Sequence, residues 1–97
     1  MKLLTKAIEK KLPKLYDTDH LGGEKTLHVK FFAPWNNLTW YGAEFDGDDL
    51  FFGYVVGHES EFGYFTLSEL ESVRGPFGLK IERDRYFTPK TVNELVA

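Results

Sequence analysis

The sequence of 97 residues contains no cysteine, so a disulfide framework and thiolate chemistry are excluded. No apolar run is long enough to cross a membrane, and the first residues lack the apolar core of a signal peptide. Hydrophobic residues make up 42% of the chain, which is enough to bury a core and argues against disorder. We therefore predict one folded domain, residues 1–97, in the cytoplasm, with no membrane partner and no cofactor.

Positive charge is absent from the middle of the chain. Between Phe31 and Val73 there is no Lys or Arg, whereas residues 1–30 and 74–97 both carry more bases than acids. The middle segment instead holds eight acids: Glu44, Asp46, Asp48, Asp49, Glu59, Glu61, Glu69 and Glu71. Two interpretations stay open, because the basic flanks can pack beside the acids and neutralise them, or an acidic end can face a cationic partner. A groove that tracks a nucleic-acid backbone fits this composition poorly, so nucleic acid is not an expected partner.

The middle of the chain predicts β-strands, because β-branched and aromatic residues come in short runs that Gly, Pro, Asn and Asp interrupt. The predicted strands cover residues 28–32, 38–45, 50–56 and 60–65. Their connections are too short for a parallel crossover, so neighbouring strands must run antiparallel. Residues 80–87 alternate apolar and charged side chains as an exposed or edge strand would. The sequence therefore predicts an α+β fold with an antiparallel meander of four to five strands.

A helix is predicted at residues 1–16, with Thr5 as its N-cap and an end near Lys11 or Leu12, where Pro13 prevents further helix. Its lysines could form a phosphate-binding face. They are Lys2, Lys6, Lys10, Lys11 and Lys14. No glycine-rich loop or nucleic-acid motif accompanies them, so a solvated helix face is the favoured interpretation. Residues 17–25 are predicted to form a loop.

Two more helices are predicted after the meander. Thr66 and Glu69 have the spacing of a capping box, so a helix should begin at Leu67. It should end at Arg74, because Gly75 suits the left-handed position that follows many helices. A short C-terminal helix is predicted to open either at residues 88–89, Thr-Pro, or at Thr91 with Glu94.

The segment His58-Glu59-Ser60-Glu61 is the first candidate for chemistry, because a histidine near carboxylates can bind a divalent metal or act in acid–base catalysis. On a strand, however, His58 and the two glutamates point to opposite faces. His20 and His28 are isolated, so no second pair of ligands is available. A solvated turn is therefore favoured, and no metal site is predicted.

Arg74 and the segment Glu82-Arg83-Asp84 form the second candidate. Arg74 comes at the end of the predicted helix, directly before Gly-Pro. It can reach a neighbouring carboxylate such as Glu61 or Asp84 and fix its helix to the sheet, or it can bind a phosphate or carboxylate of a ligand. Both roles need the same guanidinium geometry, so the sequence does not separate them.

The third candidate is a set of aromatic residues: Phe32, Trp35, Trp40, Tyr41, Tyr54, Phe62, Tyr64 and Phe65. Trp40 and Tyr41 are adjacent on a predicted strand and must point to opposite faces. We predict that Trp35 and one of Trp40 or Tyr41 stay partly exposed near the acidic loops, where contiguous aromatic surface would mark a binding site. The alternative is that helices cover both faces and that all of these rings pack in the core.

Six segments follow one another in a specific order along nearly the whole chain. They read HVKFFxPW, TWY, FGYVxGHE, EFGYFTLSEL, RGPFGL and IERD, within residues 28–84. Together they resemble a family of small bacterial proteins of the DUF2958 type, a domain of unknown function that plasmids and mobile elements often encode. The resemblance implies family membership and a mobile-element setting, but it implies no reaction, substrate or catalytic residue.

Two hypotheses for the function follow. The first is a small non-catalytic module that binds a protein through the aromatic and acidic surface of the meander. Its candidate binding residues are Trp35, Trp40, Tyr41, His58, Glu59, Glu61 and Arg74. The second is a hydrolase-like enzyme with a site built from His58, Glu59, Glu61, Arg74 and Asp84. A cavity in which at least three of these five meet would favour the enzyme, and a flat aromatic patch would favour the module.

Overall fold

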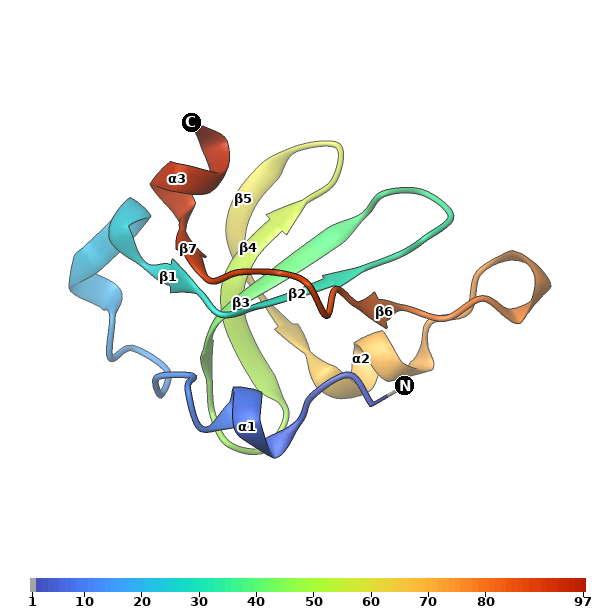
Figure 1. Ribbon diagram of the computed structural model, residues 1–97, viewed down its shortest axis with the longest axis horizontal. Coiled ribbons are helices and arrows are strands. Elements are labelled where there is room, and N and C mark those ends of the chain that lie inside the picture. Colours follow the sequence, from blue (N-terminus) through green and yellow to red (C-terminus); the bar gives the residue numbers. More distant parts are fainter. Residues whose placement is uncertain (1) are drawn as a thin grey trace.

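The computed structural model describes residues 2–97, and its main element is a five-stranded antiparallel sheet (Figure 1). The strands lie in the order β5-β4-β3-β2-β6. Their bounds are β2 (Val29–Phe32), β3 (Thr39–Phe45), β4 (Leu50–Val56), β5 (Ser60–Thr66) and β6 (Glu82–Arg83). The predicted α+β fold and its four-stranded meander are confirmed, and the predicted edge strand pairs with β2.

A second sheet of two strands was not predicted. It joins β1 (Thr26–Leu27) to β7 (Lys90–Thr91), and α3 (Val92–Val96) follows directly. Figure 1 shows the segment between β6 and β7 crossing in front of the main sheet. Of the two predicted helix starts, the capping box is the observed one: the Thr91 N–H donates to Glu94 Oε1 at 2.8 Å and the Glu94 N–H donates to Thr91 Oγ1 at 3.1 Å.

The N-terminal helix is shorter than predicted. Thr5 is its N-cap, as expected, but α1 covers only Lys6–Glu9. Beyond it the hydrogen bonds tighten, and the Leu12 N–H donates to the Glu9 carbonyl at 3.1 Å. This tight turn brings Leu12 into the core, where it is buried with Leu3 and Leu4. The helix therefore ends at Glu9, whose carbonyl has no N–H to accept from Pro13, and the tighter turn that follows buries Leu12.

Residues 17–25 were predicted as a loop, but a 3₁₀-helix, η1 (Asp19–Glu24), forms within them. Its φ of 52° at Gly22 is left-handed and divides the element into two turns. Across residues 2–97, no helix combines the length and the apolar character that a membrane span needs.

The helix after the meander, α2 (Leu67–Ser72), starts where predicted but ends two residues early. Thr66 Oγ1 accepts the Glu69 N–H at 3.1 Å, while the Thr66 hydroxyl, not its backbone N–H, meets the Glu69 carboxylate at 2.8 Å. Gly75 is extended, with φ −95°, so the predicted left-handed position is wrong. A side chain there would overlap the ring of Trp35, so close packing is what requires this glycine.

The left-handed residues lie two and three positions further on, at Phe77 and Gly78 with φ of 58° and 75°. They belong to η2 (Pro76–Gly78), a 3₁₀ turn that projects from one end of the molecule (Figure 1).

Two hydrophobic clusters cover opposite faces of the main sheet. We call the side packed against α2 the α2 face; its cluster contains Leu3, Leu4, Leu12, Val29, Phe31, Ala33, Phe45, Phe51, Phe65, Leu70 and Ile81. The other side is the α3 face, where Leu27, Tyr41, Ala43 and Val92 are buried and Tyr54, Val56, Phe87 and Leu95 are partly buried. The sheet is therefore the middle layer of the molecule, as the alternation of its side chains requires.

A β-bulge in β3 changes this alternation. The register between β3 and β4 shifts between Gly42 and Glu44, which leaves Ala43 as the extra residue. As a result Phe45 joins the α2 face, with its ring 4.5 Å from that of Phe51, and Glu44 turns toward η1 on the α3 face.

Candidate functional site

The sequence-predicted polar residues are spread over three parts of the molecule. His58 and Glu59 lie in the exposed turn between β4 and β5, and Glu61 is exposed on β5. Asp84 follows β6 and pairs with Lys30 at 3.7 Å. The hydrolase-like arrangement therefore does not assemble from these residues.

Arg74 was expected to reach Glu61 or Asp84. Its guanidinium instead donates to the carbonyls of Glu71, at 2.7 Å, and Val73, at 2.9 Å. Arg74 thus satisfies carbonyl groups left open at the end of α2, which is a structural role at a helix C-terminus.

The cavities also keep these residues apart. His58 borders a cavity of about 570 Å³ between two hairpins, together with Asn36 and Asn37. Arg74 borders one of about 180 Å³ under α2, and Asp84 borders two others, of about 360 and 240 Å³. None of these four cavities brings together three of the five residues of the enzyme hypothesis.

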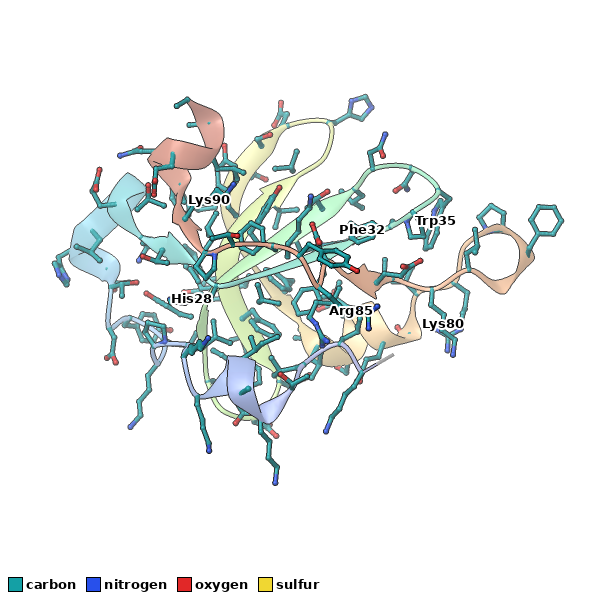
Figure 2. All side chains as sticks on the ribbon, viewed as in Figure 1. His28, Phe32, Trp35, Lys80, Arg85 and Lys90 are labelled. Atoms are coloured by element: carbon teal, nitrogen blue, oxygen red, sulfur yellow. The ribbon has the colours of Figure 1, made fainter. Side chains whose placement is uncertain are left out.

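The cavities beside Asp84 carry charges of both signs. Figure 2 shows Phe32 and Arg85 near the crossing segment, where they line the larger of the two with Lys30, Glu82 and Tyr86. The smaller one is bordered by His28, whose pKa is lowered by burial and by the neighbouring charge of Lys11. Because acids and bases alternate along this wall, it offers no cluster of one sign for a charged ligand.

The predicted aromatic residues divide between the two faces. Trp35 and Trp40 are half-buried against the α2-face cluster, and Tyr41 is buried on the α3 face beside Phe87. The partial exposure expected for Trp35 and one of the pair is therefore confirmed. Trp35, however, lies beside the η2 turn and against Gly75 rather than near an acidic loop (Figure 2).

A more continuous aromatic surface lies on the α3 face of β4 and β5. We call it the aromatic strip: Phe52, Tyr54, Phe62 and Tyr64. Phe52 is directly opposite Tyr64, and Tyr54 is directly opposite Phe62. The ring centroids are 4.9 Å apart in the first pair and 5.4 Å in the second, and Phe52 also stacks on Phe62 at 5.9 Å. Such cross-strand pairs stabilise the hairpin and hold the rings in a fixed arrangement.

The outer half of the aromatic strip is open to water. The exposed fraction is 38% for Phe62 and 54% for Tyr64, which is high for two adjacent rings on a sheet. Tyr16 lies beside them and is 64% exposed. Its hydrogen bond with Tyr64 raises the pKa of the Tyr64 phenol, and the negative charges of Asp19 and Glu44 raise it further.

A buried ion pair lies beside Phe52, on the same face of the sheet as the strip. Lys25 Nζ is 3.1 Å from Glu44 Oε2, with only 5% and 1% of the two side chains exposed, and 5.4 Å from the centre of the Phe52 ring. Lys25 also donates to the carbonyl of Thr18 at 2.6 Å, and the Thr18 hydroxyl donates to Glu44. Because each charge has several partners, the pair can remain ionised inside the protein. It fixes the segment around η1 to the bulge of β3.

The pKa of Glu44 reflects these contacts. Burial alone would raise it, but hydrogen bonds from the Thr18 hydroxyl, the Tyr16 N–H and Lys25 outweigh burial and lower it. Glu44 is therefore a carboxylate that the protein holds in its charged form.

The other acids of the middle segment remain on the surface. Among residues 2–97, the ion pairs involve Glu44 but none of the other seven. Asp46 accepts the N–H groups of Asp48, Asp49 and Leu50, which lower its pKa. Glu59, Glu61 and Glu71 are exposed. Neutralisation by the basic flanks thus applies to Glu44 alone, and Glu59 and Glu61 leave acidic surface on β5 and in the turn before it.

A family model described as a protein of unknown function, DUF2958, matches residues 3–94. The chain belongs to this family. The match covers every strand and most of α3, so the aromatic strip and the buried ion pair both lie inside the family domain. The comparisons with curated proteins and with solved structures found no match.

Sequence reasoning missed two features of this region. Three strip residues were in the predicted aromatic set, but only the pairing across the turn at residues 57–59 shows that they form one surface. The Lys25–Glu44 pair was missed because strict alternation places Glu44 on the same face as Trp40. The one signal was a single carboxylate inside the apolar run TWYGAEF.

Proposed function

We propose that this protein is a small non-catalytic module that binds another protein through the aromatic strip and the acids around it. The observation that carries the proposal is the pair of exposed rings, Phe62 and Tyr64, on an otherwise well-packed sheet. Aromatic residues are enriched at the centres of protein interfaces, because a rigid ring buries much surface at a small entropic cost.

The surroundings support a protein rather than a nucleic acid as the partner. Glu59 lies in the turn at the hairpin end of the strip, Glu61 follows it on the opposite face of β5, and Asp19 lies near Tyr64. The segment from Phe31 to Val73 offers no Lys or Arg to contact a phosphate backbone. An acidic rim around aromatic rings instead matches a protein surface with basic side chains.

The enzyme hypothesis has less support. Three of its five residues, His58, Arg74 and Asp84, border separate cavities, and Arg74 donates to carbonyl groups at its own helix end. Trp35, Trp40 and Arg74 lie away from the strip, and Tyr41 is buried. From the sequence prediction the proposed surface keeps the turn residues His58 and Glu59 and the edge residue Glu61, and Phe62 and Tyr64 replace the other aromatic residues.

The test is affinity capture from a nuclease-treated bacterial lysate with three immobilised proteins. They are the wild type, the double variant Phe62→Thr/Tyr64→Thr, and the control Tyr86→Thr. Threonine keeps strand propensity at the two strip positions. Tyr86 is 88% exposed but lies on the crossing segment, so it controls for the loss of any exposed ring.

We expect a protein that the wild type and Tyr86→Thr capture equally and that the double variant loses by about tenfold or more. Circular dichroism must show that all three proteins are folded. Equal capture of every ligand by the wild type and the double variant would show that the strip is not the binding surface.

A further inference from the structure

The outer edge of β5 is unusually open. β5 is the last strand of the main sheet, is seven residues long, and contains neither Lys nor Pro. In the part of the chain that the structure describes, only β4 pairs with it. The opposite edge, β6, has two residues, both charged. Natural proteins usually protect long edge strands with lysine, proline, a bulge or a covering segment, so an unprotected one is a candidate for pairing with another chain.

The hydrogen-bond pattern shows which backbone groups face outward. At the two ends of the β4–β5 ladder, the Leu67 N–H donates to the Asp49 carbonyl at 2.8 Å and the Gly57 N–H donates to the Glu59 carbonyl at 3.1 Å. Bonded pairs recur at every second residue of an antiparallel ladder. The odd-numbered residues of β5 therefore bond to β4, and the N–H and C=O groups of Ser60, Phe62, Tyr64 and Thr66 point to the open edge.

The side chains along this edge differ between the two faces. Phe62 and Tyr64 lie on the α3 face, so an added strand would place every second side chain beside their rings. Glu61 and Gly63 lie on the α2 face. The position that a side chain of Gly63 would occupy has no atom within 4 Å. A neighbouring strand would thus find free space at Gly63 and a carboxylate at Glu61.

We infer that an extended segment of a partner protein adds to β5 as a sixth strand, with apolar side chains on the α3 face and basic side chains on the α2 face. This inference rests on the proposed function and names its binding mode. Backbone hydrogen bonds supply affinity in strand addition, and the alternating side chains supply specificity.

The charges near the edge of β5 indicate what kind of segment can bind there. Exposed acids near the edge are Asp19, Glu59, Glu61 and Glu69, and β5 itself carries no Lys or Arg. A basic segment complements them, whereas a second copy of β5 would bring the same acids and no base. The partner is therefore a segment in which apolar residues alternate with Lys or Arg.

The experiment compares two variants of one residue. Tyr64→Val removes the ring and keeps the backbone N–H, and Tyr64→Pro removes both. Because this N–H points away from β4, proline at this position leaves the internal ladder intact. Phe62→Val and Phe62→Pro repeat the comparison at the next outward N–H, in case one proline variant does not fold.

The probe is a fluorescent peptide of about ten residues in which valine alternates with lysine, measured by fluorescence anisotropy. We expect the wild type to bind it, Tyr64→Val to bind it more weakly, and Tyr64→Pro to bind at least about tenfold more weakly than Tyr64→Val. Two further peptides carry N-methyl groups on alternate residues, one on the valines and one on the lysines. Only the peptide whose methyl groups replace the N–H groups that face β5 should lose binding to the unaltered protein. A valine–glutamate peptide should not bind.

Each other result overturns strand addition. Equal binding by Tyr64→Pro and Tyr64→Val, or no binding of the valine–lysine peptide, excludes a backbone contact at this edge. If sedimentation shows a wild-type dimer that Tyr64→Pro makes monomeric, the occupant is a second copy.

The proposed function is tested separately. It fails when the capture of every bound protein is insensitive to Phe62→Thr/Tyr64→Thr. A partner that is lost with Phe62→Thr/Tyr64→Thr but binds Tyr64→Pro as well as it binds Tyr64→Val would support the proposed function and exclude strand addition.

Discussion

At the scale of single residues, the Lys25–Glu44 pair is the most constrained feature of the molecule. Both side chains are buried, and Glu44 accepts hydrogen bonds from the N–H groups of Tyr16 and Thr18 at 2.9 and 3.1 Å. Removing one member of such a pair leaves the other charge buried without its partner, which costs far more than the net stability of the intact pair.

We expect Glu44→Gln to lower the free energy of unfolding by about 3 to 5 kcal/mol at neutral pH, measured by urea denaturation. Glutamine has nearly the same shape, so the loss reports on charge and not on volume. Glu59→Gln is the control, because Glu59 is exposed and should change stability by less than about 0.5 kcal/mol. A double variant, Lys25→Met/Glu44→Gln, should recover part of the loss, since no buried charge remains.

The effect of Glu44→Gln on the free energy of unfolding should depend on pH. The pKa of Glu44 is lower in the folded protein than in the unfolded chain, so its contribution is complete above the unfolded value of about 4.3 and is lost as the pH falls through the folded value. The stability difference between wild type and Glu44→Gln should therefore shrink in acid below about pH 4. A difference that stays constant down to acid unfolding would contradict the assigned pKa direction.

At the scale of elements, three glycines lie side by side across β3, β4 and β5. Gly42 is opposite Gly53, and Gly53 is opposite Gly63. They differ in what surrounds them. A side chain at Gly53 would overlap the backbone carbonyl of Tyr41 next to the bulge, whereas one at Gly63 would meet nothing within 4 Å. The close approach at Gly53 is part of what allows the bulge to turn Glu44 toward Lys25.

Gly53→Ala and Gly63→Ala form a matched pair that tests this difference. We expect Gly53→Ala to destabilise the protein by about 1 to 3 kcal/mol in urea denaturation, because a backbone atom must move to admit the methyl group. Gly63→Ala should be neutral or slightly stabilising, since alanine reduces the entropy of the unfolded chain. Equal effects of the two substitutions would show that the strands can separate at Gly53 without cost.

At the scale of the whole molecule, the two hydrophobic clusters share a single sheet. Phe31 and Phe51 on the α2 face, and Leu27 on the α3 face, are completely buried. Because β3 contributes to both clusters, we expect the two clusters to unfold together with the sheet. If residues 1–97 form a single domain, as the sequence predicts, the whole domain should unfold in one step.

We expect one cooperative unfolding transition. Fluorescence of Trp35 and Trp40 reports on the α2-face cluster, and hydrogen exchange of the amides in α3 reports on the other. Under increasing urea the two signals should give the same free energy of unfolding. Early exchange in α3, with unchanged fluorescence, would show that the α3-face layer opens as a separate unit.

The strands and helix caps were predictable because their causes are local. Turn residues such as Asp46 and Gly47 delimit the hairpins, and Thr5 and Thr91 accept N–H groups three residues away. The predictions that were wrong concerned positions whose conformation depends on residues far away in the sequence. Gly75 packs against the ring of Trp35, and the turn after α1 places Leu12 in the core.

The candidate site was less predictable than the fold. The sequence indicated aromatic and acidic surface on the meander, but it favoured Trp35 and one of Trp40 or Tyr41 over Phe62 and Tyr64. Which rings are exposed depends on where α3 and the crossing segment lie. That placement follows from packing between residues far apart in the chain, such as Val92 and Tyr41.

By itself, the sequence determined the meander, its antiparallel direction, the helix caps and the family, because short-range patterns of side chains and turns encode each of them. Only the tertiary structure decided that Glu44 faces Lys25, that β5 is an open edge, and that Phe62 and Tyr64 lie on it. The physical reason is that a bulge, an unpaired edge and a covered face are relations between segments. Their free energies arise only when those segments pack together.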